Sequence, residues 1–220
     1  MRASGPISGF GSVIVNGVTY DTSSATFTQD GATATQSDFA VGQFVLVTGT
    51  IDDSTSGTAA TVIFDDNVDG PVSSVDDVAR SLVVLGQTVF ISPTTSFDDS
   101  CPGSLDELAG VAAVEVSGPV RADGSIEASR IECKAVAGEL EVTGLVSNLD
   151  SMAMTFQINA LVVDYGAAVL DNFPSAGVIN EGDPVEAKGN ALGAGGELLA
   201  TRVEYKGGQF ANEDGVHAEI

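Results

Sequence analysis

A short acidic segment holds the residues best suited to bind a metal ion. Asp65, Asn67 and Asp69 alternate along the chain and Gly70 follows them, as in the first half of a calcium loop, and Asp76 stands at the twelfth position. Carboxylate and amide oxygens are the hard ligands that Ca²⁺ and Mg²⁺ prefer. No helical pattern flanks the segment, so we do not expect an EF-hand. We expect looser binding of a divalent cation, calcium being the candidate.

The remaining polar residues offer little for catalysis. His217 is the only histidine, so a Ser-His-Asp triad or a histidine-based zinc site would depend on that single residue. Carboxylate pairs such as Asp52-Asp53 and Asp98-Asp99 are adjacent in sequence, and adjacent residues of a strand point to opposite faces. The chain also has no Trp to form a sugar platform. We expect a protein that is not an enzyme and has no cofactor other than calcium.

Two cysteines, Cys101 and Cys133, show neither metal-ligand nor redox-motif spacing. A disulfide between them and a pair of free thiols are both open. The disulfide would require an oxidising compartment, because cytosolic reductants keep thiols reduced.

The charge of the chain excludes several classes of partner. With 31 acidic and 8 basic residues the formal net charge is −23, although charged residues make up only 18% of the sequence. Such a chain has few cations with which to neutralise phosphates, so we expect no nucleic-acid partner and no attraction to anionic lipid. No apolar run approaches the ~20 residues of a membrane-spanning helix, and we expect no membrane insertion. Hydrophobic residues make up 43%, which argues against disorder.

Three sequence anchors recur in the same order and define the domains. The first, a glycine followed by an apolar stretch ending in serine, stands at 5–8, 70–73 and 144–147. The second, an alternating stretch ending in glycine, stands at 45–49, 114–118 and 185–189. The third, which begins with alanine, stands at 60–64, 128–132 and 200–204. We therefore predict repeats at 1–66, 67–137 and 138–207, with 208–220 as a tail or the start of a further repeat.

Within each repeat the hydrophobic period is two, which is typical of strands. Asn16-Gly17 predicts a tight hairpin, and the matching turn of the second repeat is expected at Gly86-Gln87. Ser104–Leu108 has the pattern of a capping box and predicts one or two helical turns. Five or six short strands in about 65–70 residues indicate a small closed barrel, which leaves no sheet edge exposed. We predict an all-β protein of three tandem small OB-like β-barrels, with at most one short helix per repeat.

The same segments resemble a known family. Ile7–Val18, Val83–Val89, Phe97–Ser100 and Ala122–Ile126 are similar to stretches of bacterial proteins that carry the domain of unknown function 5666. The resemblance implies tandem OB-like β-domains in exported or lipid-anchored envelope proteins, and it implies no activity. It would place the chain in the periplasm, at the outer membrane or outside the cell.

A difference between repeats suggests an interaction surface. In the second repeat the outward positions of two strands are expected to hold Glu115, Arg130 and Glu132. The matching positions of the first repeat are apolar: Leu46, Val62 and Phe64. An outward apolar patch usually marks a contact. We expect this patch to pack against a neighbouring repeat or another subunit, or to be covered by the chain's own N-terminal segment.

Two classes of function remain after these exclusions. The first is a non-catalytic structural or assembly module, exported or at the cell surface, whose partner is itself or another envelope or surface protein. The second is a module that binds a ligand or a divalent metal through an OB-type groove or an acidic junction between domains. The low aromatic content, 6%, favours the structural interpretation, since ligand grooves of such barrels commonly carry aromatic platforms.

Overall fold

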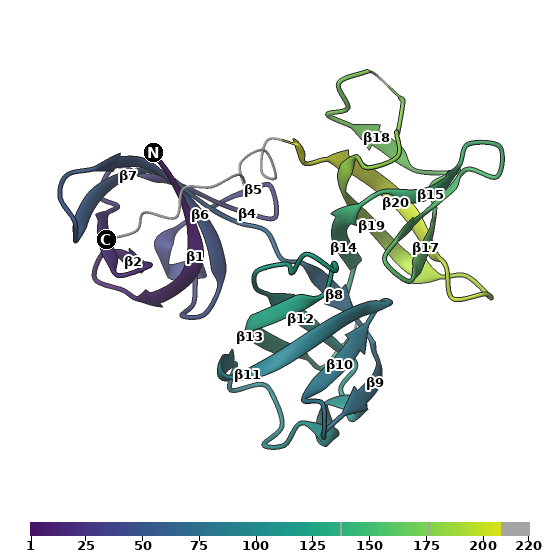
Figure 1. The fold of residues 1–220 in the computed structure, drawn as a ribbon, viewed down its shortest axis with the longest axis horizontal. Helices are drawn as coiled ribbons and strands as arrows, with labels where there is room; N and C mark the ends of the chain where they lie inside the picture. The colour runs from purple at the N-terminus through teal and green to yellow at the C-terminus, as the bar shows by residue number, and fades with distance from the viewer. Residues whose placement is uncertain (137, 176, 208–220) are drawn as a thin grey trace. The chain divides into compact units, whose positions relative to one another are not determined.

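The computed structural model describes residues 1–136, 138–175 and 177–207 and is built from β-strands (Figure 1). The described residues contain two complete helical elements, both of them 3₁₀-helices. None of their helices has the length and apolar character needed to cross a lipid bilayer. The predicted stretch 208–220, with His217, lies outside the described residues. Two compact units form, the first from residues 1–84 and 88–136, and the second from 85–87 and the described residues after 137.

Barrel 1 is a closed five-stranded ring in the first unit. Its sheet runs in the order β3-β2-β1-β6-β7, and a parallel pairing of β3 with β7 closes the ring. A small hairpin, β4-β5, pairs through β4 with the C-terminal part of β7, residues 61–64. The strands are β1 Arg2–Gly9, β2 Val13–Val15, β3 Val18–Asp21, β4 Thr26–Gln29, β5 Ala32–Ala34, β6 Phe44–Ile51 and β7 Ser56–Phe64. The core is made of Val, Ile, Ala, Phe and Tyr side chains, with Tyr20 and Phe64 among the largest.

Barrel 2 repeats this strand order in the same unit. Its first strand is divided at Pro71 into β8 and β9, and the sheet runs β9-β10-β11-β13-β12-β8, with β11 and β13 parallel. The strands are β8 Val68–Gly70, β9 Val72–Asp76, β10 Ser81–Val84, β11 Gln87–Phe97, β12 Ala113–Ser117 and β13 Ile126–Lys134.

Barrel 3, in the second unit, has the same plan. Its first strand is divided at Val146, and the order is β15-β16-β17-β20-β19-β14, with β17 and β20 parallel and β18 beside β20. The strands are β14 Leu140–Leu145, β15 Ser147–Asp150, β16 Thr155–Ile158, β17 Leu161–Asp164, β18 Val169–Asp171, β19 Pro184–Leu192 and β20 Leu198–Tyr205. The all-β prediction of three tandem barrels is confirmed.

Local sequence explains the hairpins. Asn16 and Gly17 both have positive φ, 53° and 77°, as a two-residue turn of this type requires. In barrel 2 the corresponding turn uses Leu85 and Gly86, one residue earlier than expected. Gly118, the glycine of the second anchor, permits a close approach of strands, because a Cβ there would lie 2.1 Å from the carbonyl oxygen of Glu127. The repeated glycines therefore mark places where two backbones touch.

The helical prediction was right in place and wrong in capping. A 3₁₀-helix, η2, spans Asp106–Gly110 between β11 and β12, but its N-cap is Leu105 and no side chain caps it. A capping box is found instead in barrel 1, at the 3₁₀-helix η1 Gln36–Asp38. There the Asp38 carboxylate accepts hydrogen bonds from the backbone N–H and the hydroxyl of Thr35. Each helix joins the third strand region to the fourth, so one short helix at most occurs in each described repeat.

Candidate functional site

Three residues of the predicted metal loop have separate structural roles. Asn67 Oδ1 accepts a hydrogen bond from the backbone N–H of Gly118 at 2.7 Å, which ties the start of β8 to the end of β12. Asp69 lies within strand β8 and faces Glu115 on β12. Asp76 ends β9 and accepts a hydrogen bond from the backbone N–H of Ala79 at 2.9 Å. The segment therefore forms the beginning of a barrel strand. Its side chains are spread along an extended chain and are not gathered as in a metal-binding loop.

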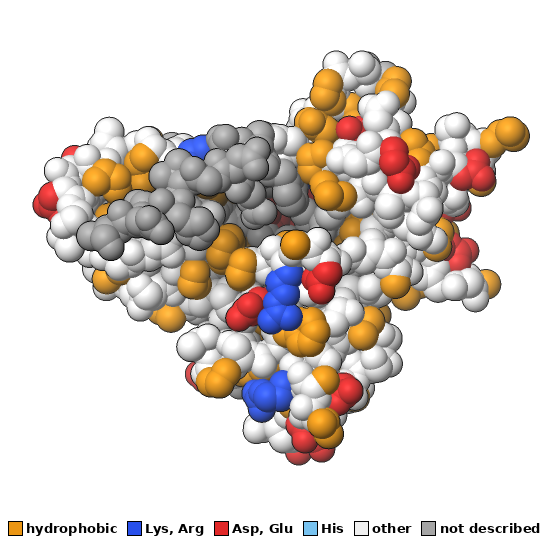
Figure 2. Space-filling view, in the orientation of Figure 1, with side chains coloured by type: hydrophobic (Ala, Val, Ile, Leu, Met, Phe, Trp, Pro, Cys, Tyr) orange, Lys and Arg blue, Asp and Glu red, His pale blue; other side chains and the backbone are white. Residues whose placement is uncertain are grey.

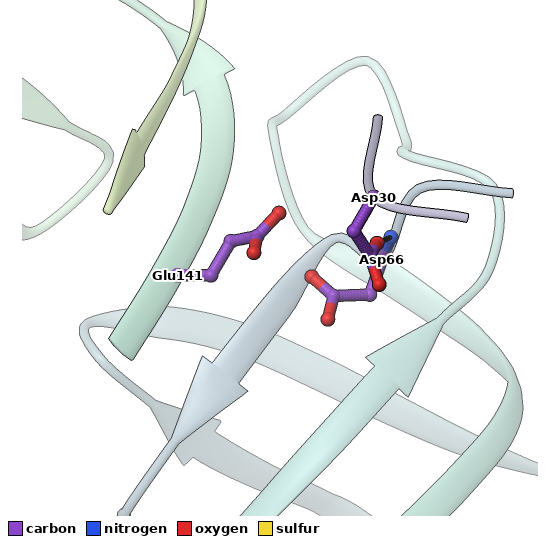
Figure 3. A group of neighbouring side chains, drawn as sticks. All are labelled: Asp30, Asp66 and Glu141. Atoms are coloured by element: carbon purple, nitrogen blue, oxygen red, sulfur yellow. Dashed lines mark hydrogen bonds between the residues drawn. The ribbon is translucent and has the colours of Figure 1, made fainter. Parts of the chain in front are cut away.

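A different set of carboxylates meets in the first unit. Asp66, Asp69 and Glu115 each offer an oxygen within 4.8 Å of the others. Asp66 and Asp69 are buried and Glu115 is half-buried. The backbone N–H of Asp66 donates to Asp30 Oδ1 at 3.3 Å, and Figure 3 shows these two residues of the first unit. Of the predicted loop, Asp69 is thus a member of this acidic group, while Asp65 and Asp76 are not.

Lys134, at the end of β13, extends across this group. Its Nζ lies 2.5 Å from Asp69 Oδ2 and 2.9 Å from Glu115 Oε2. Burial alone would lower the pKa of Lys134, but the hydrogen bonds and charges of Asp69 and Glu115 raise it well above its usual range. The ammonium is therefore the stable form, and it compensates part of the negative charge that a metal ion would otherwise neutralise.

The third barrel has a second, more deeply buried charged cluster. Lys188 Nζ lies 2.5 Å from Glu141 Oε2 and 3.5 Å from Glu186 Oε2, and Lys206 Nζ lies 3.0 Å from Glu186 Oε1. All four residues are at most 7% exposed. Two carboxyl groups so close in low dielectric cannot both ionise without cost.

Their pKa values separate accordingly. Burial, with the charge and hydrogen bond of Glu186, raises the pKa of Glu141 to about 9. Burial would also raise the pKa of Glu186, but the hydrogen bond with Glu141 and the charges of Lys206 and Lys188 lower it. At neutral pH we therefore expect Glu141 to be a neutral acid and Glu186 a carboxylate held by two lysines.

The predicted apolar patch requires a correction. Leu46 is half-buried on an outward position of β6, but Val62 and Phe64 are fully buried in the core of barrel 1. The reason is the register of the ladder: Leu46 pairs with Ile63, so Ile63 shares its face, while Val62 and Phe64 point inward. The outward apolar pair of this barrel is thus Leu46 and Ile63.

Cys101 and Cys133 are joined by a disulfide in barrel 2, with their Cα atoms 4.9 Å apart. It fastens the loop after β11 to the last strand. Beside it, Arg130 Nη2 lies 2.6 Å from Asp98 Oδ2 in the same loop and 3.8 Å from Glu132 Oε2. The loop that carries η2 is thereby held to β13 by a covalent bond and an ion pair.

The sequence patterns described above did not predict the lysine contacts. Their signal is a triplet at the end of the last strand, Glu132-Cys133-Lys134 in one repeat and Glu204-Tyr205-Lys206 in another. Alternation puts the glutamate and lysine of each triplet on one face. On the face of the molecule shown in Figure 2, acidic side chains are scattered and no large basic patch is visible.

These features define the class of protein as a tandem array of small β-barrels with one strand order. The family described as Domain of unknown function (DUF5666) matches residues 4–63, 69–132 and 143–204, so the chain belongs to this family and carries three repeats of its domain. The resemblance drawn from the sequence is confirmed. A search of curated proteins finds no match.

Proposed function

We propose that the chain is a non-catalytic structural or assembly module of tandem β-barrels, exported to the cell envelope or surface. The observation that carries this proposal is the pairing of charged side chains with one another on the strands of barrels 2 and 3. Lys134, Arg130 and Lys188 all bind carboxylates of their own barrel. Charged groups committed in this way stabilise a scaffold and are not arranged around a substrate.

The disulfide supports the exported location. Disulfides persist in oxidising compartments such as the periplasm and the cell exterior, and are rare in the cytosol. Small domains in those compartments commonly gain stability from such bonds. The partner we propose is a second copy of the chain or another envelope or surface protein, and neither nucleic acid nor the membrane interior.

Light scattering after size exclusion tests the assembly role. We expect the purified chain, 22.2 kDa, to form species of higher mass as its concentration rises, with or without calcium. The control is Leu46→Glu/Ile63→Lys, which places charges on the outward apolar pair while leaving the core residue Phe64 in place. A chain that stays monomeric, and whose melting temperature rises with calcium, would contradict the assembly role.

A second candidate function is the binding of a divalent cation or another ligand. The acidic group of Asp66, Asp69 and Glu115 favours a cation, because its oxygens lie within 4.8 Å of one another. The strand order of the barrels also resembles that of OB-type barrels, whose second and third strands and adjoining loops bind ligands. Titration calorimetry with calcium on the wild type and on Asp66→Asn tests the cation, with Asp52→Asn as the matched surface control. Absence of calcium heat in the wild type would eliminate it.

A further inference from the structure

Lys134, Asp69 and Glu115 form a compact triad on three adjacent strands of barrel 2. Asp69 on β8 pairs directly with Glu115 on β12, and Lys134 extends from β13, on the far side of β12. The amine lies 2.5 Å from Asp69 and 2.9 Å from Glu115. The side chains of Asp69 and Glu115 are only 10% and 13% exposed, and that of Lys134 is 29% exposed. An amine and a carboxyl group are thus held in contact, largely out of water, beside a second carboxyl group.

An ion pair of this kind differs from an amide by one molecule of water. In dilute solution water favours the separate groups. Groups fixed in contact by a folded chain react with effective molarities of about 10⁵–10⁸ M, and a largely buried site gives water little access for the reverse hydrolysis. From this geometry we propose that Lys134 and Asp69 join in an intramolecular isopeptide bond, with Glu115 as the group that transfers protons.

The reaction balances without an oxidant, reductant or co-reactant. The triad starts as the ion pair, and one proton moves from Lys134 Nζ to the Asp69 carboxylate, leaving a neutral amine and a neutral acid. Nζ then attacks Asp69 Cγ and the C–N bond forms. Glu115 takes the second proton from nitrogen and delivers it to the departing hydroxyl group. The C–O bond breaks, water leaves, and Glu115 is regenerated as a carboxylate.

At the corresponding positions the other repeats lack the complete triad; the contact of Lys188 with Glu141 in barrel 3 joins two directly opposed residues of β14 and β19 instead. In barrel 3 the ladder places Thr143 opposite Glu186, where barrel 2 has Asp69 opposite Glu115. Barrel 3 therefore has a lysine and a glutamate, Lys206 and Glu186, but no carboxyl acceptor at that position. In barrel 1 the corresponding pair is Ser4 and Leu46. The repeats thus provide internal comparisons, and barrel 2 is where we place the bond.

The bond would join the first strand of barrel 2 to its last. Cys133, the neighbour of Lys134, is already bonded to Cys101. Two covalent links would then meet at the end of β13 and close the barrel against unfolding from either end. This inference stands apart from the proposed assembly role, because it concerns a bond within one chain.

The intact mass of the purified full chain tests the proposal. After reduction of the disulfide we expect the denatured wild type to be lighter than its sequence by one water, and protease digestion to yield one peptide pair linked through Lys134 and Asp69. Lys134→Arg and Asp69→Ala should restore the full mass. Glu115→Gln, which preserves side-chain size, should remain folded by circular dichroism and retain the full mass.

Lys206→Arg is the matched control, because it changes the corresponding lysine of barrel 3, and it should leave the water loss unchanged. A folded wild-type chain that keeps its full sequence mass overturns the bond. A linked peptide pair from another lysine overturns its position. Water loss by Glu115→Gln at the wild-type rate overturns the role of Glu115. Failure of the chain to assemble in the light-scattering experiment would leave the mass result unaffected.

Discussion

Removal of the disulfide should selectively destabilise barrel 2. The bond joins residues 32 positions apart. For a loop of that length, the chain-entropy relation gives about 12 cal/mol/K, or about 4 kcal/mol at 25 °C. The loop contains η2, β12 and most of β13, so the loss falls on the strands that close this barrel. Because a domain is stable by only about 5–15 kcal/mol, this is a large fraction of the total.

Two perturbations separate the bond from the side chains. Reduction of the wild type breaks the bond and keeps both sulfurs, while Cys101→Ala/Cys133→Ala also removes the packing of Cys133, which is 7% exposed. Hydrogen exchange measured by mass spectrometry across a urea series reports the free energy of unfolding for peptides of each barrel. We expect a loss of about 4 kcal/mol in barrel 2 in both cases, slightly larger in the double variant.

Barrel 1 is the internal control, because both cysteines lie in barrel 2. Its peptides should exchange at unchanged rates after reduction. A loss in barrel 2 below about 1 kcal/mol, or an equal loss in barrel 1, would refute the argument that the loop entropy of this single bond sets the stability of barrel 2.

Three further perturbations test other features. Phe64→Ala should destabilise barrel 1 by about 3–5 kcal/mol and Ile63→Ala by roughly 1–2 kcal/mol in urea unfolding; equal losses would contradict the inward position of Phe64. Gly118→Ala should cost at least about 1–3 kcal/mol in thermal unfolding, since the new Cβ would lie 2.1 Å from a backbone oxygen of Glu127; an unchanged melting temperature would contradict it. Because the folded pKa of Glu141 is raised from 4.5 to about 9, barrel 3 holds a proton that the unfolded chain releases, so its stability should fall as pH rises across this window. Glu141→Gln should flatten that slope in urea unfolding, and a wild type that gains stability across the window would contradict the assignment.

Local signals predicted the architecture well. The turn at Asn16-Gly17 depends on two adjacent residues that tolerate positive φ. The turn carboxylates Asp76 and Asp150 bond backbone N–H groups within three residues, as their type and place indicate. Repetition of such signals in three copies made the barrel predictable, because each copy has to bury the same set of apolar positions.

Register was harder to predict because it depends on a distant strand. Val62, Ile63 and Phe64 are consecutive apolar residues, so alternation does not show which of them faces inward. The pairing of Val47 with Val62, and of Val116 with Ile131, fixes the answer, and it shifts the third anchor of the first repeat by one residue. A one-residue shift reverses every side chain of the strand, which is why two of the three patch residues were wrong.

The predicted calcium loop shows a related limit. Spacing along the sequence identifies oxygen ligands but does not show which backbone groups compete for them. Asn67 is taken by the N–H of Gly118, 51 residues away, and Asp69 by Lys134, 65 residues away. The carboxylates that do meet, Asp66, Asp69 and Glu115, come from two strands and the segment before them. Such a group becomes visible only when the ladder is known.

The ion pairs also show which charges of this chain, whose net charge is −23, remain available to a partner. The chain has only 8 basic residues, and at least six of them, Arg121, Arg130, Lys134, Lys188, Arg202 and Lys206, bind carboxylates of the described barrels. A polyanionic partner would have to break those pairs. Removing one member of a buried pair, such as Lys206 with Glu186, costs about 3–5 kcal/mol. A partner with a basic surface would meet exposed turn carboxylates such as Asp77 without disturbing a barrel. The distribution of charge therefore supports our proposal of a neutral or basic protein partner.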